Sequence, residues 1–453
     1  MRERTIDASA LERNVAGAVS EWRALGDSDD TFAVEGMRPS FACAPSGEDE
    51  LSALLRAAND AGAAVIPWGG GTRMSLGFPP RAADVVAETR RLDEIVEYEP
   101  ADLTVTVQAG ITLAALQSRL RAEGQMLALD PAAADRATIG GLTSANASGP
   151  LRLMYGSARD LVIGTRVVNA DGVISKSGGR VVKNVAGYDL NKLYVGALGT
   201  VGVVVQLSFK LHPLPQAQSM LVAAFRTVDD ASKVVAALMR SPLGPAAVEL
   251  LDATAAREVR PDVALPDGGC LLVVAAHGFE AAIVRSLRDL RELCSAATDL
   301  EDVRDEAALD TLSAALREFP DPSRAGSALL KAAVPPSRSA STLATIRREA
   351  RDDGFEPALL SHAGSGIVYA RLSPQTWEDD AVLRLGVLVE RVRAHARGEG
   401  GSLVVEACPT AAKRLPAFDV WGDPGSAFPV MQALKQNLDP KGTLNPGRFI
   451  GRL

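Results

Sequence analysis

Apolar residues recur first at helical and then at strand spacing in the early part of the chain. In residues 46–66, three leucines and an alanine fall on one face of a predicted helix, and an apolar run at 63–66 follows as a strand. Ser46, with Asp49 three residues later, resembles a capping box at the start of that helix. Residues 104–108 alternate as a half-buried strand, and Thr112 is placed to cap a helix that stops at Gly124. The pattern predicts an α+β arrangement.

The pattern changes character near residue 215. Before it, residues 161–168 read as a strand, Asp171-Gly172 as a hairpin turn, and 203–205 as a buried strand. Two prolines between 211 and 215 then indicate a domain boundary. Beyond it, apolar strands alternate with helices at 220–225, 231–239, 271–276, 279–294, 329–334, 339–352, 366–372 and 379–396, and a last helix follows at 426–437. This half is typical of an antiparallel sheet covered by helices on one side.

Three consecutive glycines follow the strand at 63–66, within the stretch PWGGGTRMSLG from Pro67 to Gly77. Glycines let backbone N–H groups converge with no Cβ in the way, which is how a chain holds a phosphate. The stretch is not a G-x-G-x-x-G fingerprint, because Met74 stands at the third glycine position, and no Walker G-K-[ST] follows. Two prolines and a strand-like 85–87 come next instead of a helix. We interpret the stretch as a phosphate loop between two strands, with a tight turn as the alternative.

Two further loops rich in small residues are expected between predicted strands, at 137–149 and 187–202. Their hydroxyls and backbone N–H groups are available to an oxyanion at little steric cost. From Arg152 to Lys192, seven basic residues stand against three acidic ones, a local excess of +4. An anionic ligand is one explanation, and solvated surface positions are the alternative for any single cation. Together the three small-residue segments predict one extended ligand-binding cleft.

Composition excludes several other classes. The chain has 453 residues, 47% hydrophobic and 23% charged, and its net charge of −8 argues against nonspecific nucleic-acid binding. No apolar run approaches the roughly 18 residues of a membrane span. The charged start at 1–7 lacks the apolar region of a signal peptide, so we expect a cytoplasmic protein. Four widely separated cysteines, with no C-x-x-C, exclude an iron–sulfur cluster or a zinc site built from cysteine alone.

Four segments occur in the order typical of one flavoprotein family: PWGGGT at 67–72, ATIGG at 137–141, VVKNVAGYDL…LGTVG at 181–202 and DPKGTLNPGR at 439–448. Together they resemble the family named after vanillyl-alcohol oxidase, whose FAD domain is called PCMH-type. The resemblance implies four units: an N-terminal extension (1–35), a two-subdomain PCMH-type FAD-binding domain (36–215), a substrate or cap domain with a helix-covered antiparallel sheet (216–415), and a C-terminal segment returning to the flavin (416–453).

The resemblance also implies the cofactor. In this family the glycine loop and the 138–149 segment wrap the FAD pyrophosphate, and the strand near Val201 meets the adenine end. Members with covalent flavin carry a histidine where Thr72 stands, and no cysteine occurs at 138–156 to form a second bond, so we expect non-covalent FAD. The cofactor-binding residues expected on this basis are Pro67, Trp68, Gly69, Gly70, Gly71, Thr72, Arg73, Ser75, Gly77, Pro131, Thr138, Gly140, Gly141, Asn146, Ser148, Gly149, Tyr155, Gly156, Tyr188, Gly199, Val201, Val203 and Asn445.

Two of these residues have ordinary alternatives. Arg73 would touch a phosphate oxygen, and a solvated position explains it equally well. Tyr188 follows a glycine at a sharp turn and would stack near the flavin, although packing at a domain seam also accounts for it.

The sequence specifies the substrate-binding residues less closely than the cofactor-binding residues. Metal-dependent relatives carry H-x-G-D-G-N-x-H in the second domain. The aligned segment here, 362–369, loses the aspartate, the asparagine and the second histidine, so we expect no bound metal. His362 suits a catalytic base near neutral pH, with a structural histidine beside a glycine turn as the alternative. Lys331 and Arg371, on predicted strands, would hold a carboxylate or pair on the domain surface.

Segments 180–190 and 418–422 resemble the FAD-binding subunit of bacterial glycolate oxidase, which is grouped with the D-lactate and other 2-hydroxyacid dehydrogenases. We therefore expect an FAD-dependent dehydrogenase or oxidase that transfers a hydride from a small 2-hydroxy acid to flavin N5. Its electrons would pass to a partner, with an iron–sulfur subunit and a second flavin subunit expected in a complex. The eroded motif at 362–369 leaves a second hypothesis, a flavin-carrying relay or assembly subunit with a degenerate substrate site.

Overall fold

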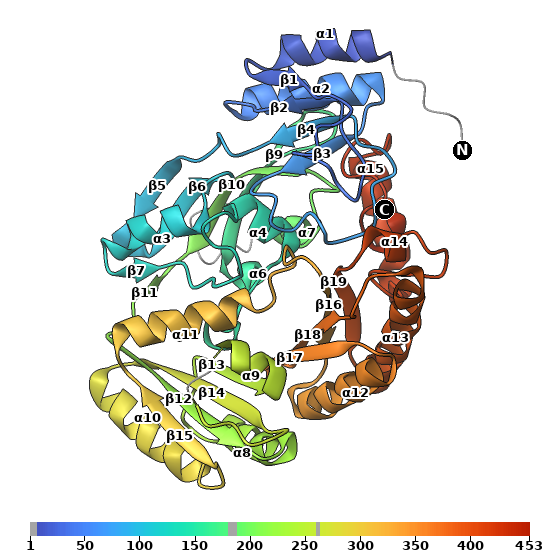
Figure 1. Cartoon of the computed structure of the whole chain (residues 1–453). Coiled ribbons are helices and arrows are strands. Elements are labelled where there is room, and N and C mark those ends of the chain that lie inside the picture. The colour runs from blue at the N-terminus through green and yellow to red at the C-terminus, as the bar shows by residue number, and fades with distance from the viewer. Residues whose placement is uncertain (1–6, 180–187, 260–262) are drawn as a thin grey trace.

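Two lobes face each other in the computed structural model, which describes residues 7–179, 188–259 and 263–453. Figure 1 shows the smaller sheets in the upper lobe and one large sheet in the lower lobe. The red C-terminal helices run back from the lower lobe toward the upper one (Figure 1). The last segment of the chain therefore lies against the first lobe.

The glycine loop leaves the edge strand of a small four-stranded sheet. Its order is β1 (Trp22–Ala24), β2 (Phe41–Cys43), β4 (Val85–Glu88) and β3 (Val65–Trp68), and β2, β4 and β3 run parallel. Helix α2 (Glu48–Ala61) buries its apolar face in the core beside this sheet, and α1 (Ala8–Ala18) packs on α2. The proposed capping box is wrong, because Gly47 is the N-cap and has no side chain to donate or accept. Three acidic residues in the first turn of α2 stabilise the helix end instead.

A second, fully antiparallel sheet carries the other small-residue segments. Its order is β5 (Ile95–Glu99), β6 (Thr104–Gln108), β10 (Val203–Lys210), β8 (Val162–Val168) and β9 (Ile174–Gly178). Thr112 caps α3 (Leu113–Arg121) by accepting from the Ala115 N–H, as predicted. The segment after Thr138 is a short helix, α4 (Ile139–Ala145), and not the loop we expected.

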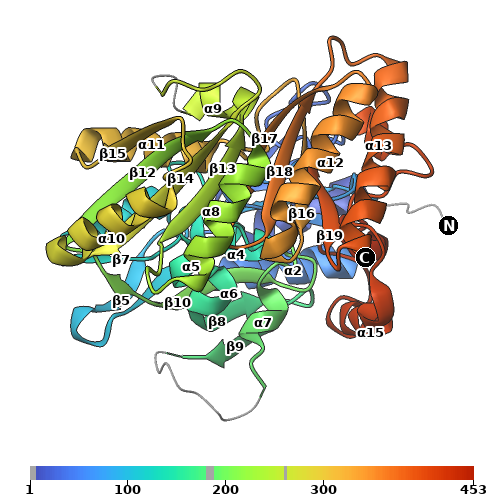
Figure 2. The same cartoon turned by 90° about the horizontal axis from the view of Figure 1, so that it is seen from below.

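The lower lobe is built on one eight-stranded antiparallel sheet. Its order is β15 (Asp299–Val303), β12 (Ala217–Phe225), β14 (Cys270–Gly278), β13 (Ala247–Asp252), β17 (Glu356–His362), β18 (Ile367–Ser373), β16 (Ala328–Ala333) and β19 (Ser402–Ala407). Four helices cover one face: α8 (Val228–Arg240), α10 (Glu280–Leu293), α12 (Ser339–Asp352) and α13 (Asp379–Gly398) (Figure 2). Two more, α9 (Ala253–Val259) and α11 (Glu306–Glu318), lie on the opposite face, which we call the inner face.

Side chains alternate between the two faces along each strand of this sheet. The inner face packs on α9 and α11 and also on Leu151 of the upper lobe. Residues on this face therefore contact the first lobe at Leu151.

The C-terminal segment returns to the glycine loop. After α14 (Thr410–Lys413) and α15 (Phe428–Leu438), the chain runs beside β3, where the Val65 N–H donates to Thr443 O at 2.7 Å and the Asn445 N–H donates to Val65 O at 3.0 Å. Buried Lys435 anchors the turn by donating to Thr200 O (2.7 Å), Asp439 (2.6 Å) and Leu444 O (2.9 Å). Asn445 is thereby placed at the end of β3.

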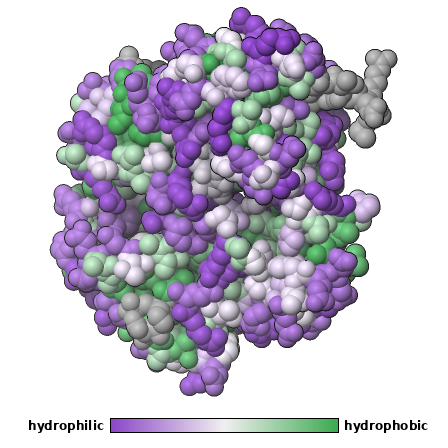
Figure 3. Space-filling view, turned by 45° about the horizontal axis from the view of Figure 1, so that its top comes forward, coloured by the Kyte–Doolittle hydropathy of each residue, from purple (hydrophilic) through white to green (hydrophobic). Residues whose placement is uncertain are grey.

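Short elements complete the described chain. They are β7 (Gln125–Met126) paired with β11 (His212–Pro213), α5 (Arg152–Tyr155), α6 (Ala158–Leu161), α7 (Asn191–Tyr194), and the 3-10 turns η1 (Pro100–Asp102), η2 (Pro336–Arg338), η3 (Gly425–Ala427) and η4 (Ile450–Arg452). No helix of the described residues is both long and apolar enough to span a bilayer. On the face shown in Figure 3, hydrophobic residues form separate patches within a mostly hydrophilic surface.

Candidate functional site

One pocket collects the three small-residue segments and the C-terminal segment. It is lined by Pro67, Trp68, Gly69, Gly70, Gly71, Thr72, Arg73, Met74, Thr89, Thr138, Gly140, Gly141, Ser144, Ala145, Leu198, Gly199, Val203, Val204, Asn445 and Arg448. Segments more than 300 positions apart in the sequence thus form the wall of a single cavity. The fold builds this pocket at the ends of β3 and β10.

Thirteen of the predicted cofactor residues line this pocket and ten do not. Those in the pocket are Pro67, Trp68, Gly69, Gly70, Gly71, Thr72, Arg73, Thr138, Gly140, Gly141, Gly199, Val203 and Asn445. Those outside it are Ser75, Gly77, Pro131, Asn146, Ser148, Gly149, Tyr155, Gly156, Tyr188 and Val201. Tyr188 is 93% exposed. The sequence motif around it continues into residues 180–187, which lie outside the described chain.

The glycines are required by packing as well as by ligand access. A Cβ on Gly70 would overlap the carbonyl oxygen of Arg136, and one on Gly69 would overlap the hydroxyl of Thr138. Gly71 has φ +72°, a backbone conformation that side chains disfavour, and lies against the Trp68 ring. The glycine loop is therefore interlocked with residues 136–138, which places the two segments on one continuous wall.

Two buried polar atoms at this pocket lack partners in the described chain. Asn445 is almost fully buried; its amide donates to Leu198 O at 2.6 Å, but its Oδ1 accepts no hydrogen bond. The Nε of Arg448 likewise makes no hydrogen bond. Buried polar atoms of native proteins are normally satisfied, so an acceptor-rich, donor-bearing ligand is expected here. The glycine cradle, an open amide oxygen and a buried guanidinium together fit the phosphates and hydroxyls of FAD.

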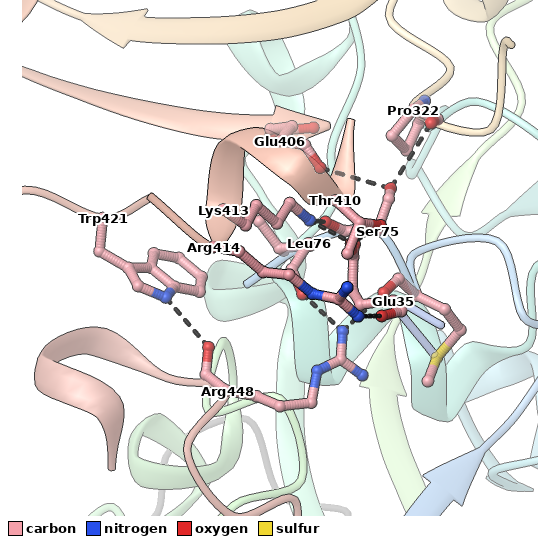
Figure 4. Close-up of polar contacts among 11 residues, drawn as sticks. Glu35, Ser75, Leu76, Pro322, Glu406, Thr410, Lys413, Arg414, Trp421 and Arg448 are labelled. Carbon is pink, nitrogen blue, oxygen red and sulfur yellow. Dashed lines mark hydrogen bonds and ion pairs between the residues drawn. The ribbon is translucent and has the colours of Figure 1, made fainter. Parts of the chain in front are cut away.

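The segment after the glycine loop, 73–76, is held by the lower lobe and the C-terminal segment (Figure 4). Lys413 of α14 contacts Ser75 O and the carboxylate of Glu35, and the Ser75 hydroxyl reaches Glu406 O at 3.4 Å. Arg448 donates from Nη2 to Met74 O and Leu76 O, both at 2.6 Å. We call these contacts the loop clamp. They fix the backbone next to the pocket by ion pairs and hydrogen bonds rather than by apolar packing.

A row of polar side chains crosses the inner face of the large sheet. Arg73 pairs with Glu406 (3.1 Å), and Glu406 pairs with Lys331 (3.2 Å). Lys331 lies 5.6 Å from the Tyr369 ring centroid, and Tyr369 contacts the ring of His362 with centroids 5.4 Å apart. The row joins the pocket to the strand ends at β17.

His362 ends this row in a buried pair with Glu249. The Nδ1 of His362 lies 2.6 Å from Glu249 Oε2, and both residues are at most 2% exposed. In the described chain neither His362 Nε2 nor Glu249 Oε1 has a hydrogen-bond partner. Burial raises the pKa of Glu249, and the neighbouring His362 opposes that rise. The pair is a carboxylate–imidazole dyad with one nitrogen left open.

Lys331 remains a cation despite its burial. Desolvation lowers its pKa, but Tyr369 and Glu406 together raise it above the usual value. The Glu406 carboxyl is also pulled toward its charged form: burial raises its pKa, and Lys331 and Arg73 lower it further than burial raises it. The sequence-predicted Lys331 thus lies in the row as a charged group.

Arg371, the third predicted substrate residue, is held elsewhere. Its guanidinium pairs with Glu258 of α9 and lies 4.6 Å from the centroid of the Phe319 ring. The structure brings His362 and Lys331 into one row but does not bring Arg371 into it.

A second cavity of about 710 Å³ lies between the lobes and reaches Glu249 of the dyad. Its walls include Asp130, Glu249 and His277. Burial raises the pKa of Asp130 to about 8, and Glu249 adds to that shift. Burial lowers the pKa of His277 to about 4, and its Nδ1 lies 3.0 Å from the Tyr155 hydroxyl. The cavity therefore presents a neutral acid and a neutral imidazole near pH 7.

Sequence reasoning missed several of these residues. Glu249 is the one carboxylate inside the apolar run AVELL at 247–251, and a charge in a buried strand is a recognisable signal. Glu406 stands in a similar run, and Arg448 ends the motif NPGR already noted at the C-terminus. Asp130 and Lys413 carry no comparable local signal. In the described chain, no three His, Cys, Asp or Glu side chains group as a metal site, and the absence of a metal stays a prediction.

Comparison with known proteins gives the family. Residues 39–178 match the family described as FAD binding domain, and residues 214–449 match that described as FAD linked oxidases, C-terminal domain. The chain is 28% identical to glycolate oxidase subunit GlcD of Bacillus subtilis, covering 91% of this chain and 89% of that protein. It is 29% identical to a D-lactate dehydrogenase of Archaeoglobus fulgidus, covering 90% and 91% of the two chains.

The solved structures support the same architecture. p-Cresol methylhydroxylase with substrate bound superposes with a TM-score of 0.74 at 16% identity, over 97% of this chain and 96% of that one. The expected PCMH-type fold with an antiparallel, helix-covered cap is confirmed. With an N-terminal FAD-binding domain and a matching C-terminal domain that spans half of its length, the chain belongs to the FAD-linked oxidases.

Proposed function

We propose that this protein oxidises a small 2-hydroxy acid with non-covalently bound FAD. The observation that carries the proposal is the buried Glu249–His362 dyad on the inner face of the FAD-linked oxidase domain. Relatives named glycolate oxidase subunit and D-lactate dehydrogenase support the substrate class. Glycolate and D-lactate are the first substrates to test.

The dyad suits removal of the hydroxyl proton. A hydrogen bond from Nδ1–H to Glu249 would fix the tautomer of His362 and leave Nε2 as the acceptor. When Nε2 takes the proton, the adjacent carboxylate compensates the new positive charge inside the protein. Bound FAD would accept the hydride released from the same carbon. Glu249 acts through His362, so it is a positioning residue.

Lys331 is the better of the two candidates for the substrate carboxylate. It is kept charged by Glu406 and lies in the same row as His362. Arg371 already pairs with Glu258, so a carboxylate would have to compete with that partner. Lys331→Met should raise KM for the hydroxy acid more than Arg371→Met does.

Anaerobic mixing of the FAD-loaded chain with glycolate or D-lactate tests the proposal. Bleaching of the oxidised flavin band is expected, and His362→Asn should slow it by about 100-fold or more, as expected for loss of a general base. His395→Asn, on the outer helix α13, is the matched control and should leave the rate unchanged. An unchanged flavin spectrum across several hydroxy acids would refute the proposal for this chain alone.

The mode of flavin attachment is a separate part of the proposal. Thr72 lines the pocket where covalently flavinylated relatives carry a histidine. Acid precipitation should release all flavin into the supernatant. Flavin that stays with the protein pellet would contradict non-covalent binding.

The second candidate, a flavin-carrying relay or assembly subunit, is favoured by one observation. All three candidate substrate residues, His362, Lys331 and Arg371, are already engaged by carboxylates. An iron–sulfur subunit and a second flavin subunit would then be needed for turnover. In that case the flavin is reduced by dithionite, yet hydroxy acids bleach it only after the native complex is reconstituted.

A further inference from the structure

Two arginines line the FAD pocket, and their electrostatic surroundings differ. Arg73 is paired with Glu406 at 3.1 Å. Arg448 is 3% exposed, and in the described chain it forms no ion pair with a carboxylate. It uses Nη2 on two backbone carbonyls and leaves Nε unused. Arg448, unlike Arg73, is thus a buried cation with no carboxylate in contact, and Glu35, which acts on it at longer range, is already paired with Lys413.

The loop clamp as a whole carries the same imbalance. Together with the neighbouring Arg73 and Lys331, it has four cations, Arg73, Lys331, Lys413 and Arg448, and two carboxylates, Glu35 and Glu406. Four cations less two carboxylates leave two positive charges uncompensated. Burying unpaired charge is unfavourable, so the arrangement is expected to be completed by a dianionic group. The pyrophosphate of FAD carries two negative charges at neutral pH.

The position of Arg448 matches that role. It lines the pocket together with Gly70 and Gly71, whose backbone forms the predicted phosphate cradle. Its backbone carbonyl accepts from the Phe78 N–H (3.1 Å) and from the Trp421 indole N–H (3.1 Å), so the main chain at 448 is fixed as well as the side chain. A guanidinium held this way loses little conformational freedom when it meets a phosphate.

We propose that Arg448 is the cation that neutralises the FAD pyrophosphate and that the C-terminal segment delivers it to the glycine loop. This inference rests on the FAD-binding part of the proposed function. FAD retention would then depend on docking of the segment at 439–448 beside β3. Arg73, being paired already, contributes less.

FAD affinity of the full-length apo-protein tests the inference. Flavin fluorescence titration gives Kd for the wild type, Arg448→Gln and Arg448→Lys. Because hydrogen bonds to charged groups are worth about 1.5–3 kcal/mol, Arg448→Gln should weaken FAD about 10- to 100-fold. Arg448→Lys keeps the positive charge and should lose less FAD affinity. Lys441→Met removes an exposed cation from the same segment and should change Kd less than about twofold.

A second readout separates phosphate recognition from a structural role. ADP and adenosine both compete with FAD, and only ADP carries phosphates. The wild type should prefer ADP, and Arg448→Gln should lose about tenfold or more of that preference. If Arg448→Gln does not fold, Arg448→Lys provides the test. This variant should still prefer ADP over adenosine, and loss of that preference would overturn the inference.

Failure of the Arg448 assignment and failure of the proposed function would give different results. If the wild type binds FAD and Arg448→Gln binds it equally well with an intact ADP preference, the assignment of Arg448 is wrong and FAD binding stands. If the wild type itself binds no FAD, the proposed function falls first.

Discussion

Asp130 should make the protein less stable as pH rises, and Asp130→Asn should remove that dependence. Asp130 is partly buried at the inter-lobe cavity, its carboxyl accepts from the Leu151 N–H at 2.9 Å, and its pKa is raised by desolvation from 3.8 to about 8. Between these values the folded state holds one more proton than the unfolded state. Stability therefore falls by about 1.4 kcal/mol per pH unit through that window and levels off above pH 8. Asparagine keeps an acceptor for Leu151 without a charge.

Thermal unfolding from pH 5 to pH 9, with the same excess of FAD, measures the effect. The difference in Tm between Asp130→Asn and wild type should widen by roughly 1–2 °C per pH unit up to about pH 8, then stay constant. Contributions from buried carboxyls that are not coupled to Asp130, such as Asp252, occur in both proteins and cancel. Asp135→Asn, at an exposed position nearby, controls for loss of a carboxylate. Parallel Tm curves for Asp130→Asn and wild type would refute the reasoning.

Two further predictions concern the glycine loop and the loop clamp. Lys413→Met should destabilise the protein by about 3–5 kcal/mol, because it leaves the buried Glu35 carboxylate without its cation. In denaturant unfolding, the double variant with Glu35→Gln should recover part of that loss, and no recovery would contradict the pairing. Gly70→Ala should yield little folded, FAD-loaded protein, because its Cβ would overlap the Arg136 carbonyl oxygen. Normal yield with bound flavin, measured by absorbance after purification, would show that the backbone at Arg136 can move.

Local patterns predicted the elements well because those patterns act over a few residues. The helix with apolar positions at 51, 54, 55 and 58, the strand at 104–108 and the Thr112 cap all occur where expected. The predicted Ser46 cap is wrong, because the helix begins at Glu48 with Gly47 as its N-cap. Three carboxylates in the first turn stabilise that end of the helix. The small residues and hydroxyls at 138–149 predict a loop. Thr138 nevertheless caps a short helix there, which packs against the second sheet.

The sequence alone determined which segments carry chemistry: the glycine loop, the two other small-residue segments and the closing NPGR motif. Their residue types dictate backbone freedom and charge wherever they lie in space. Only the tertiary structure decided which charges are compensated. Arg73 meets Glu406 333 positions away, and His362 meets Glu249 113 positions away. Such pairs depend on how strands from different parts of the chain align, which no local pattern encodes. Between the two pocket arginines, the fold thereby singled out Arg448, and not Arg73, as the buried cation with no carboxylate in contact.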